Sequence, residues 1–230
     1  MVKKVIVISL GGSQIIRDGK VNISFLKKFK KIILKHRKKF KFIIVCGGGS
    51  VARMYINGLK SIGAKEKFQN FAGISVTRTN ARFMNYFFAI DSECGIPHKI
   101  YNVKRKIKKQ DIVFCGALEY HENQTSDSTS AQVAREFKSE FINVTNVEGL
   151  YDKNPSKYKN AKLIKEISWD NFYKMASAIK FSPGQHFVLD TGAAKIILKR
   201  KIKTYIIGNN LKNLDKLLLK KKFFGTTIFG

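Results

Sequence analysis

Cysteine and proline are both scarce in this chain, with three of each among 230 residues. Cys46, Cys94 and Cys115 are an odd number without C-x-x-C spacing, so the sequence favours neither a disulfide framework nor a zinc ribbon. A reducing cytoplasm fits this cysteine usage. No Pro-rich or Ser-rich linker divides the chain, and its length suits one substantial core. We therefore expect a single domain over residues 1–230.

Long hydrophobic runs are missing as well. No apolar run approaches the roughly 18 residues that a membrane-spanning helix needs. The apolar stretch Val5–Leu10 follows a basic start but is short, and no small-residue cleavage site comes after it. The sequence therefore indicates neither a signal peptide nor a membrane partner.

Acidic residues are few: 16 Asp and Glu face 44 Lys and Arg, which gives a formal net charge of +28. This charge suggests a partner such as nucleic acid, anionic lipid or a phosphorylated small molecule. The excess consists of 36 Lys against 8 Arg and accompanies many Ile, Asn and Phe, which is typical of compositional drift. Nucleic-acid surfaces rely more on Arg. We therefore favour drift plus a phosphate-handling site, and expect the basic runs to be solvated faces of amphipathic elements.

Short apolar runs alternate along the chain with longer amphipathic segments. Strands are expected at Val5–Leu10, Phe42–Cys46, His98–Val103, Ile112–Cys115, Phe141–Thr145 and Thr204–Ile207. Helices are expected at Asn22–Lys38, Ala52–Leu59, Thr77–Phe88, Ser128–Phe137, Trp169–Ile179 and Ala193–Lys199. Asn22 or Ser24 is expected to cap the first helix. The alternation predicts an α/β fold with a mainly parallel central sheet covered on both faces.

Two of the expected strands end directly in glycine loops, "VIVISLGGS" and "FIIVCGGGS". Glycine at a strand end lets backbone N–H groups approach a ligand, and a following helix N-terminus adds a positive dipole. Two such loops in one sheet suggest a single polyanion held from two sides.

Two other phosphate motifs fit the second loop poorly. Gly47, Gly49 and Ala52 satisfy the dinucleotide pattern G-x-G-x-x-A, which needs an acidic residue closing the next strand. Glu66 has the right distance, but no strand precedes it. The stretch "GLKSIGAKE" has the glycine spacing of a P-loop and lacks its Gly-Lys-Ser/Thr ending.

Two further loops carry polar residues after a strand. Gln124, Thr125 and Ser126 offer amide and hydroxyl groups suited to a base or a sugar. Asp127 either caps the next helix or orients cationic groups at a transferring phosphate. The stretch "TNVEGLYDKNP" could hold an adenine and ribose, or merely turn. The four histidines have no metal-ligand spacing, so no metal is assigned to side chains alone.

The order of these motifs resembles that of a known family. "LGGS", "GGGSVAR", "FAGISVTRTNA", "QTSDSTSAQVA", "TNVEGLYDKNP", "VLDTGAAKII" and "GTTI" together are similar to the archaeal-type uridylate (UMP) kinases of the amino acid kinase superfamily. The resemblance spans essentially the whole chain. "TNVEGLYDKNP" is typical of the superfamily, whereas "GISVTRTNA" is particular to UMP kinases. The related isopentenyl phosphate kinases carry a histidine after the glycine loop, where this chain has Ser50-Val51-Ala52-Arg53.

The resemblance implies an αβα sandwich that transfers the γ-phosphate of ATP to UMP in pyrimidine nucleotide biosynthesis, with Mg2+ as cofactor and typically a hexamer as assembly. It assigns the ATP phosphates to Ser9, Leu10, Gly11, Gly12, Ser13, Gly49 and Arg53. It assigns the adenosine to Thr145, Tyr151 and Asn154. It assigns UMP to Gly48, Asn70 and the loop Leu118–Ser126, including Gln124, Thr125 and Ser126.

The expected reaction needs no general base, because the attacking oxygen of the UMP phosphate is already ionised at neutral pH. Catalysis would rest on alignment and on neutralising the charge of the transferring phosphoryl group. The glycine-loop amides, Arg53 and Mg2+ would neutralise it, with Asp127 orienting the cationic partners. Arg53 and Asp127 are therefore the expected catalytic residues.

Several positions depart from the family pattern. Asn70, Glu148 and Asn154 stand where relatives usually have Asp, and Ser9 stands where many superfamily members have Lys. The loop between Gly116 and Asp127 is about two residues longer than usual. Two alternatives therefore stay open: a kinase of the same superfamily acting on another phosphomonoester, and a weakened relative that binds nucleic acid through its basic faces.

Overall fold

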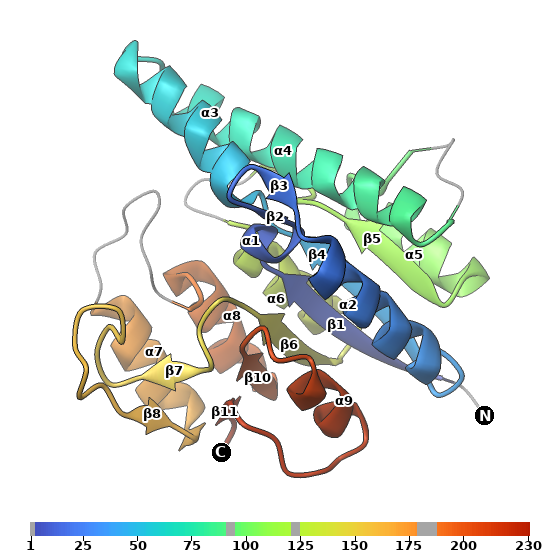
Figure 1. Cartoon of the computed structure of the whole chain (residues 1–230), viewed down its shortest axis with the longest axis vertical. Helices are drawn as coiled ribbons and strands as arrows, with labels where there is room; N and C mark the ends of the chain where they lie inside the picture. The colour runs from blue at the N-terminus through green and yellow to red at the C-terminus, as the bar shows by residue number, and fades with distance from the viewer. Residues whose placement is uncertain (1–2, 91–94, 121–124, 179–187) are drawn as a thin grey trace.

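The computed structural model describes residues 3–90, 95–120, 125–178 and 188–230. A seven-stranded sheet in the order β5-β4-β1-β6-β10-β11-β9 lies between layers of helices (Figure 1). Its strands are β1 (Lys4–Leu10), β4 (Phe40–Cys46), β5 (Ile112–Cys115), β6 (Glu140–Val144), β9 (Glu166–Ile167), β10 (Thr204–Ile207) and β11 (Thr226–Ile228). Strands β5 to β10 in this order run parallel, whereas β11 is antiparallel to β10 and parallel to β9. The predicted mainly parallel sheet is confirmed.

Alternate residues of the central strands face two separate cores, because successive side chains of a strand point to opposite faces. In β1, Ile6 and Ile8 enter one core and Val7 enters the other. The first core is covered by α2 (Ile23–His36), α4 (Glu66–Phe87) and α9 (Lys212–Leu218). The second is covered by α5 (Ile100–Lys109), α6 (Ser126–Glu136), α7 (Trp169–Ser177) and α8 (Thr191–Arg200). The chain thus forms the expected αβα sandwich.

The remaining elements are short or lie at the edge of the sheet. They are α1 (Gly12–Ile15), α3 (Gly49–Ser61), the hairpin of β2 (Ile16–Arg17) and β3 (Lys20–Val21), and the pair β7 (Leu150–Tyr151) and β8 (Leu163–Ile164). The sequence patterns had indicated none of these short strands, because two residues cannot show a period.

One predicted strand is wrong: the segment His98–Val103 belongs largely to helix α5. Val103 and Ile107 are buried four residues apart, while Lys104 and Arg105 between them are exposed. Spacing of four places both residues on one helix face. The predicted segment ended at Val103, so it contained too little of this period to separate a helix from a strand.

Helix α4 begins at Glu66, well before the predicted start at Thr77. Its first half forms a hairpin with α3 that projects beyond the sheet (Figure 1). The earliest buried residue of α4 is Val76, and α3 buries only Ala52. A helical segment that projects from the molecule has no buried face, so its sequence carries no apolar stripe of helical period. Exposed apolar residues such as Ile62 and Phe68 lie beside the connection between α3 and α4, at the tip of this hairpin.

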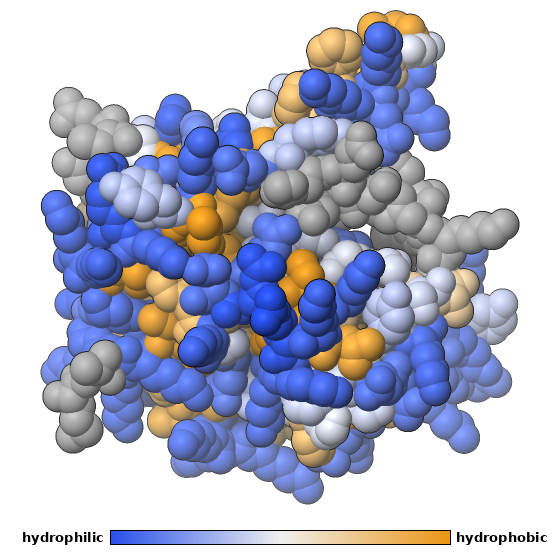
Figure 2. All heavy atoms as spheres, turned by 180° about the vertical axis from the view of Figure 1, so that it is seen from behind, coloured by the Kyte–Doolittle hydropathy of each residue, from blue (hydrophilic) through white to orange (hydrophobic). Residues whose placement is uncertain are grey.

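Hydrophilic side chains cover most of the described part of the face that Figure 2 shows. In α5 and α2 the buried residues are almost all apolar and most lysines are exposed, which confirms that these basic runs are solvated faces. Cys46 and Cys115 are buried free thiols, and Cys94 lies outside the described residues. Among the helices of the described part of the chain, none has both the length and the apolar character needed to cross a bilayer.

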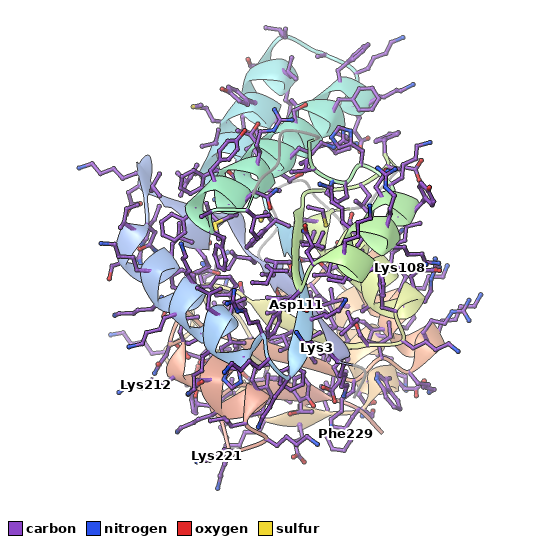
Figure 3. All side chains as sticks on the ribbon, turned by 90° about the vertical axis from the view of Figure 1, so that its right-hand side faces the viewer. Lys3, Lys108, Asp111, Lys212, Lys221 and Phe229 are labelled. Atoms are coloured by element: carbon purple, nitrogen blue, oxygen red, sulfur yellow. The ribbon has the colours of Figure 1, made fainter. Side chains whose placement is uncertain are left out.

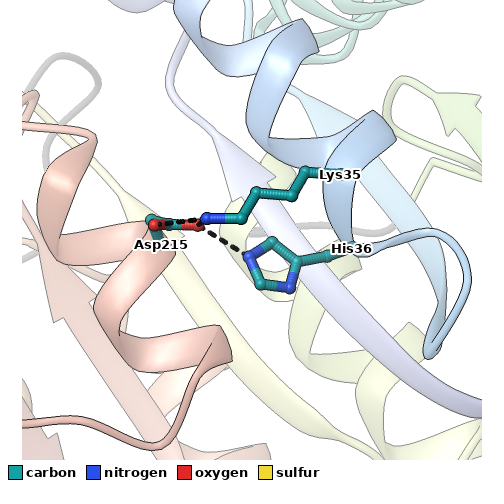
Figure 4. Close-up of polar contacts among 3 residues, drawn as sticks. All are labelled: Lys35, His36 and Asp215. Carbon is teal, nitrogen blue, oxygen red and sulfur yellow. Dashed lines mark hydrogen bonds and ion pairs between the residues drawn. The ribbon is translucent and has the colours of Figure 1, made fainter.

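Helices α2 and α9 are joined by a polar contact beside the first core (Figure 4). The buried His36 places Nε2 2.7 Å from Oδ1 of Asp215, and Lys35 Nζ lies 2.9 Å from both oxygens of that carboxylate. The hydrogen bond from Lys35 is the main cause that lowers the pKa of Asp215; His36 adds to it, and partial burial opposes it. Asp215 therefore favours folding in its ionised form.

Replacing Asp215 with Asn is expected to lower the free energy of unfolding at pH 7 by about 1 kcal/mol. Because the folded pKa lies below the ordinary 3.8, the contribution of Asp215 is fully present above 3.8 and is lost as the pH falls from there through the lower folded pKa. Urea unfolding at pH 7 and pH 3 measures this: the gap between wild type and variant should shrink at pH 3. Asp18→Asn, at an almost fully exposed acid, is the control, and an equal loss there would contradict the assignment.

Candidate active site

The two glycine loops meet at the carboxyl edge of the sheet, because β1 and β4 are adjacent parallel strands with Leu10 opposite Cys46. The N–H of Gly47 donates to the carbonyl of Leu10 at 2.9 Å. A Cβ atom on Gly12 would lie 2.1 Å from the amide nitrogen of Gly49, and one on Gly47 would lie 2.7 Å from that of Gly12. The backbones of the two loops are therefore in direct contact. The predicted proximity of the loops is confirmed.

Helix α3 begins at this contact. Gly49 has a φ of +65°, which glycine adopts at little cost, and the helix starts there without a side-chain cap. The N–H groups of an uncapped first turn lack intrahelical partners and suit an anion. Arg53 follows one turn later with an exposed side chain, and among the described residues it has no hydrogen-bond or ion-pair partner. Its guanidinium group can therefore turn toward a phosphate at the loops.

A carboxylate lies beside the first glycine loop, on the second core's side of the sheet. Ser9 in β1 is 1% exposed, and its hydroxyl donates to Oδ1 of Asp127 at 2.8 Å. Asp127 is in the first turn of α6, but Thr125 is the cap: its hydroxyl accepts from the N–H of Asp127 at 3.1 Å. Thr125 therefore caps α6, and Asp127 does not.

Asp190 holds the N-termini of α6 and α8 together. Its carboxylate caps α8 by accepting from the N–H of Ala193 at 2.7 Å. It also accepts from the hydroxyl of Ser128 at 2.6 Å and from that of Thr125. The sequence patterns gave Asp190 no role. Its position before a helix is a capping signal, but its partners on α6 lie 62 and 65 residues away, beyond any local pattern.

The environment of Asp127 disfavours a negative charge. Burial, together with the neighbouring Asp190 carboxylate, raises the pKa of Asp127 from 3.8 to about 7, against the opposing hydrogen bond from Ser9. A carboxylate in this state is short of a positive partner, so a cation that arrives beside it is stabilised. The arrangement therefore suits binding of a cationic group next to the glycine loops.

Helix α4 fixes two of the surrounding loops through "TRTNA". The amide of Asn80 donates to the carbonyl of Gly47 at 2.7 Å, and the hydroxyl of Thr77 accepts from the N–H of Ala117 at 2.9 Å. Arg78 donates through Nε to the carbonyl of Ala117 at 3.1 Å and through Nη2 to that of Leu118. Thr77, Arg78 and Asn80 had no individual role in the sequence-based assignment. They position the loops predicted to bind phosphate and UMP.

The residues assigned to UMP lie on three segments. Gly48 is in the second glycine loop and the half-buried Asn70 is in the projecting half of α4. Thr125 and Ser126 are at the start of α6, where the Thr125 hydroxyl already contacts Asp190. Gln124 lies outside the described residues. The UMP assignments remain predictions.

The residues assigned to ATP lie on both sides of β1. The side chain of Leu10 is fully buried in the first core, so only its main chain is available to a ligand, while Gly11, Gly12, Ser13 and Gly49 belong to the two loops. Thr145 follows β6, and Tyr151 is in β7. The side-chain oxygen of Asn154 accepts from the N–H of Ser156 at 2.9 Å, which leaves its amide nitrogen as a donor. These assignments also remain predictions.

The donor set at the site suits a cation that is shared with phosphate. Among the described residues, no group of three or more His, Cys, Asp or Glu could hold a metal ion. The Asp190 carboxylate accepts from donors at the starts of α6 and α8, whereas within the described chain only one oxygen of Asp127 accepts a hydrogen bond, from Ser9. Mg2+ commonly binds through one or two carboxylates plus substrate phosphates. Asp127 fits that kind of site.

Comparisons with known proteins agree with this architecture. The model of the amino acid kinase family matches residues 4–208. A uridylate kinase of Thermococcus kodakarensis is 32% identical over 229 residues, which cover 97% of this chain and 98% of that protein. The crystal structure of uridylate kinase from Archaeoglobus fulgidus, 32% identical, covers 97% of this chain and 99% of its own with a TM-score of 0.82. That of UMP kinase from Ureaplasma parvum, 22% identical, shares the fold over the whole of both chains with a TM-score of 0.80. The chain therefore belongs to the amino acid kinase family, and within it to the archaeal uridylate kinases.

Proposed function

We propose that the protein is a UMP kinase, which transfers the γ-phosphate of ATP to UMP and releases UDP and ADP. The observation that carries the proposal is the direct backbone contact between the two glycine loops, with the uncapped start of α3 and Asp127 beside it. We infer the substrate from relatives named uridylate kinase, which are 32% identical over nearly the full length. We also propose that residues 1–230 form one domain, and that the enzyme is cytoplasmic and hexameric; light scattering tests the hexamer.

In the proposed reaction, the chain aligns two phosphates and neutralises charge. The N–H groups of the glycine loops and of the first turn of α3 hold the phosphates in line, and Arg53 approaches the oxygens that gain charge. Mg2+, when bound with ATP, supplies further neutralisation. Asp127, once ionised beside a cation, holds that positive charge in place. The UMP phosphate oxygen needs no side chain to remove a proton.

The substrate is tested directly by following ADP release from ATP with UMP, CMP, AMP or isopentenyl phosphate as acceptor. We expect UMP to give the highest kcat/KM. Turnover with isopentenyl phosphate or AMP instead would establish a kinase for another phosphomonoester. No turnover with any acceptor, together with salt-sensitive binding of nucleic acid, would establish the nucleic-acid alternative and remove the proposal.

Arg53→Ala is expected to lower kcat by about 10²-fold or more, because one preorganised donor to the transferring phosphoryl group is lost. The side chain is exposed, so the melting temperature should stay unchanged. Steady-state kinetics with ATP and UMP measure the effect. Arg105→Ala on α5 is the matched control, since that arginine is also exposed and lies over the ring of Tyr101. Wild-type kinetics in Arg53→Ala would remove this residue from the mechanism.

A further inference from the structure

A cluster of positively charged side chains lies at the edge of the sheet opposite the glycine loops, where the strands begin. Figure 3 looks onto this side, with Lys3 and Asp111 labelled beside the starts of β1 and β5. A cavity of about 490 Å³ is bounded there by the first residues of β1 and β6, the segment before β10 and the ends of α6 and α8. We call it the basic groove, after six of its lining residues: Lys4, Arg135, Lys138, Arg200, Lys201 and Lys203.

Two matching turns build the walls of the basic groove. Lys138 follows α6 with a φ of 46°, and Lys201 follows α8 with a φ of 51°. In each turn the lysine N–H donates to a carbonyl three residues back, Arg135 at 3.2 Å and Leu198 at 3.2 Å, and the next N–H donates five residues back. These are the backbone bonds that close a helix end with a left-handed residue. The carbonyls that accept these bonds are thus satisfied by the backbone, without the lysine side chains.

The charges in the basic groove are far from balanced. Among the described lining residues Glu140 is the single carboxylate, and it is 3.2 Å from Lys4. Lys201 is 3.8 Å from an exposed carboxylate on α7 and lies over a tryptophan ring. Within the described part of the chain, Arg135, Lys138 and Arg200 have no ion-pair partner within 4.0 Å. Like charges around one cavity attract an anion that neutralises several of them together.

Compositional drift toward lysine does not account for this cluster. The chain has only 8 arginines, and two of them, Arg135 and Arg200, line the basic groove. Arginine presents a planar fork that matches phosphate oxygens. Lys138 and Lys201 also occupy left-handed positions, where glycine is the residue of least cost. Lysine at such a position adds charge to the groove but makes the helix end less stable than glycine would.

We propose that the basic groove binds a short polyphosphate chain, either free or as part of a nucleotide. Its volume lies in the range of small-molecule sites, which is about 300–1,000 Å³. Among the described lining residues none is aromatic, so they offer no platform on which a base could stack. Recognition therefore rests on the phosphates, and the limited volume of the groove favours a compact polyanion over a nucleic-acid strand.

The test uses the left-handed lysines, because glycine at these positions removes a charge and relieves the backbone. Lys138→Gly, Lys201→Gly and the double variant are titrated with inorganic tripolyphosphate by calorimetry, and melting temperatures are recorded. We expect two binding events in the wild type, one at the active site and one in the groove. The double variant should lose affinity in one of them by about tenfold or more. Its melting temperature should not fall.

Lys220→Gly is the matched control, because Lys220 ends α9 with a φ of 56° and the same pair of backbone bonds but does not line the groove. This variant should bind tripolyphosphate as the wild type does. Equal losses in the control and the groove variants would reduce the effect to general charge and overturn the proposal. So would wild-type affinity and stoichiometry in the double variant.

Two further titrations identify the source of the ligand. Loss of ATP binding in the double variant, at the same step as tripolyphosphate, supports a nucleotide; loss of tripolyphosphate binding alone supports a free polyphosphate. A 12-nucleotide single-stranded RNA that binds the groove more tightly than either would overturn the proposal in favour of a nucleic-acid surface.

Discussion

Replacing Gly12 with alanine is expected to abolish turnover and to lower the free energy of unfolding by about 3 kcal/mol or more. The added Cβ would lie 2.1 Å from the amide nitrogen of Gly49 and 2.5 Å from the carbonyl carbon of Gly48. Both contacts are with backbone at the ends of neighbouring strands, so neither can yield by rotating a side chain. The two loops must move apart, and the N–H groups that we propose to bind the phosphates move with them.

Urea unfolding and steady-state kinetics measure the effect of Gly12→Ala. The matched control is Gly58→Ala in α3, where an added Cβ would meet no atom of the described residues within 4 Å. Alanine favours a helix interior over glycine, so this control should gain about 0.5–1 kcal/mol and keep its activity. Wild-type stability in Gly12→Ala would show that the loops are not in the contact described.

Asp127→Asn is expected to lower kcat by at least about 10²-fold while making the protein more stable at pH 8. The amide keeps an oxygen that can accept from Ser9 but cannot hold a positive charge at the phosphates. Removing the charge also removes the cost of burying it beside Asp190. Activity and stability should therefore change in opposite directions at one residue.

The pH dependence of this stability gain follows from the raised pKa of Asp127, which is about 7 against an ordinary 3.8. Between these values the folded state holds a proton that the unfolded state releases, so the wild type loses stability as the pH rises. The asparagine side chain of the variant is neutral at every pH in this range. The variant should therefore match the wild type near pH 4 and exceed it at pH 8, by on the order of 2 kcal/mol.

Thermal unfolding at several pH values, with Asp18→Asn as an exposed control, measures the gain. Lower stability of Asp127→Asn than of the wild type at pH 8 would mean that the carboxylate is already paired with a cation in the free protein. In that case its pKa would not be raised.

The central strands could be predicted because they are buried on both faces and therefore appear as continuous apolar runs. Val5–Leu10, Phe42–Cys46, Ile112–Cys115 and Thr204–Ile207 all lie within strands of the sheet. The short strands β7, β8 and β9 have two residues each and leave no such run. The outer half of α4 was missed for a related reason, because a helix without a buried face has no apolar stripe.

The candidate site could be predicted where its residues follow a strand directly, as the glycine loops do. Parallel strands bring their carboxyl ends to one edge, so two loops distant in sequence could be placed together. The supporting contacts follow no such rule. Arg78 reaches the carbonyl of Leu118 across 40 residues, and Asp190 reaches Thr125 across 65. These contacts depend on how α4, α6 and α8 pack, which a single sequence does not show.

The place of β11 in the sheet determines when folding can finish during synthesis on the ribosome. Within the seven-stranded sheet β9 pairs only with β11, and the hydroxyl of Thr226 links the N–H of Leu150 to the carbonyl of Ile164. The nascent chain can assemble the five parallel strands once Ile207 has emerged. The segment from β7 to β9, which includes Tyr151, can pack against the sheet only after residues 226–228 have emerged. The glycine loops are therefore the early part of the site, and the predicted adenosine side is the late one.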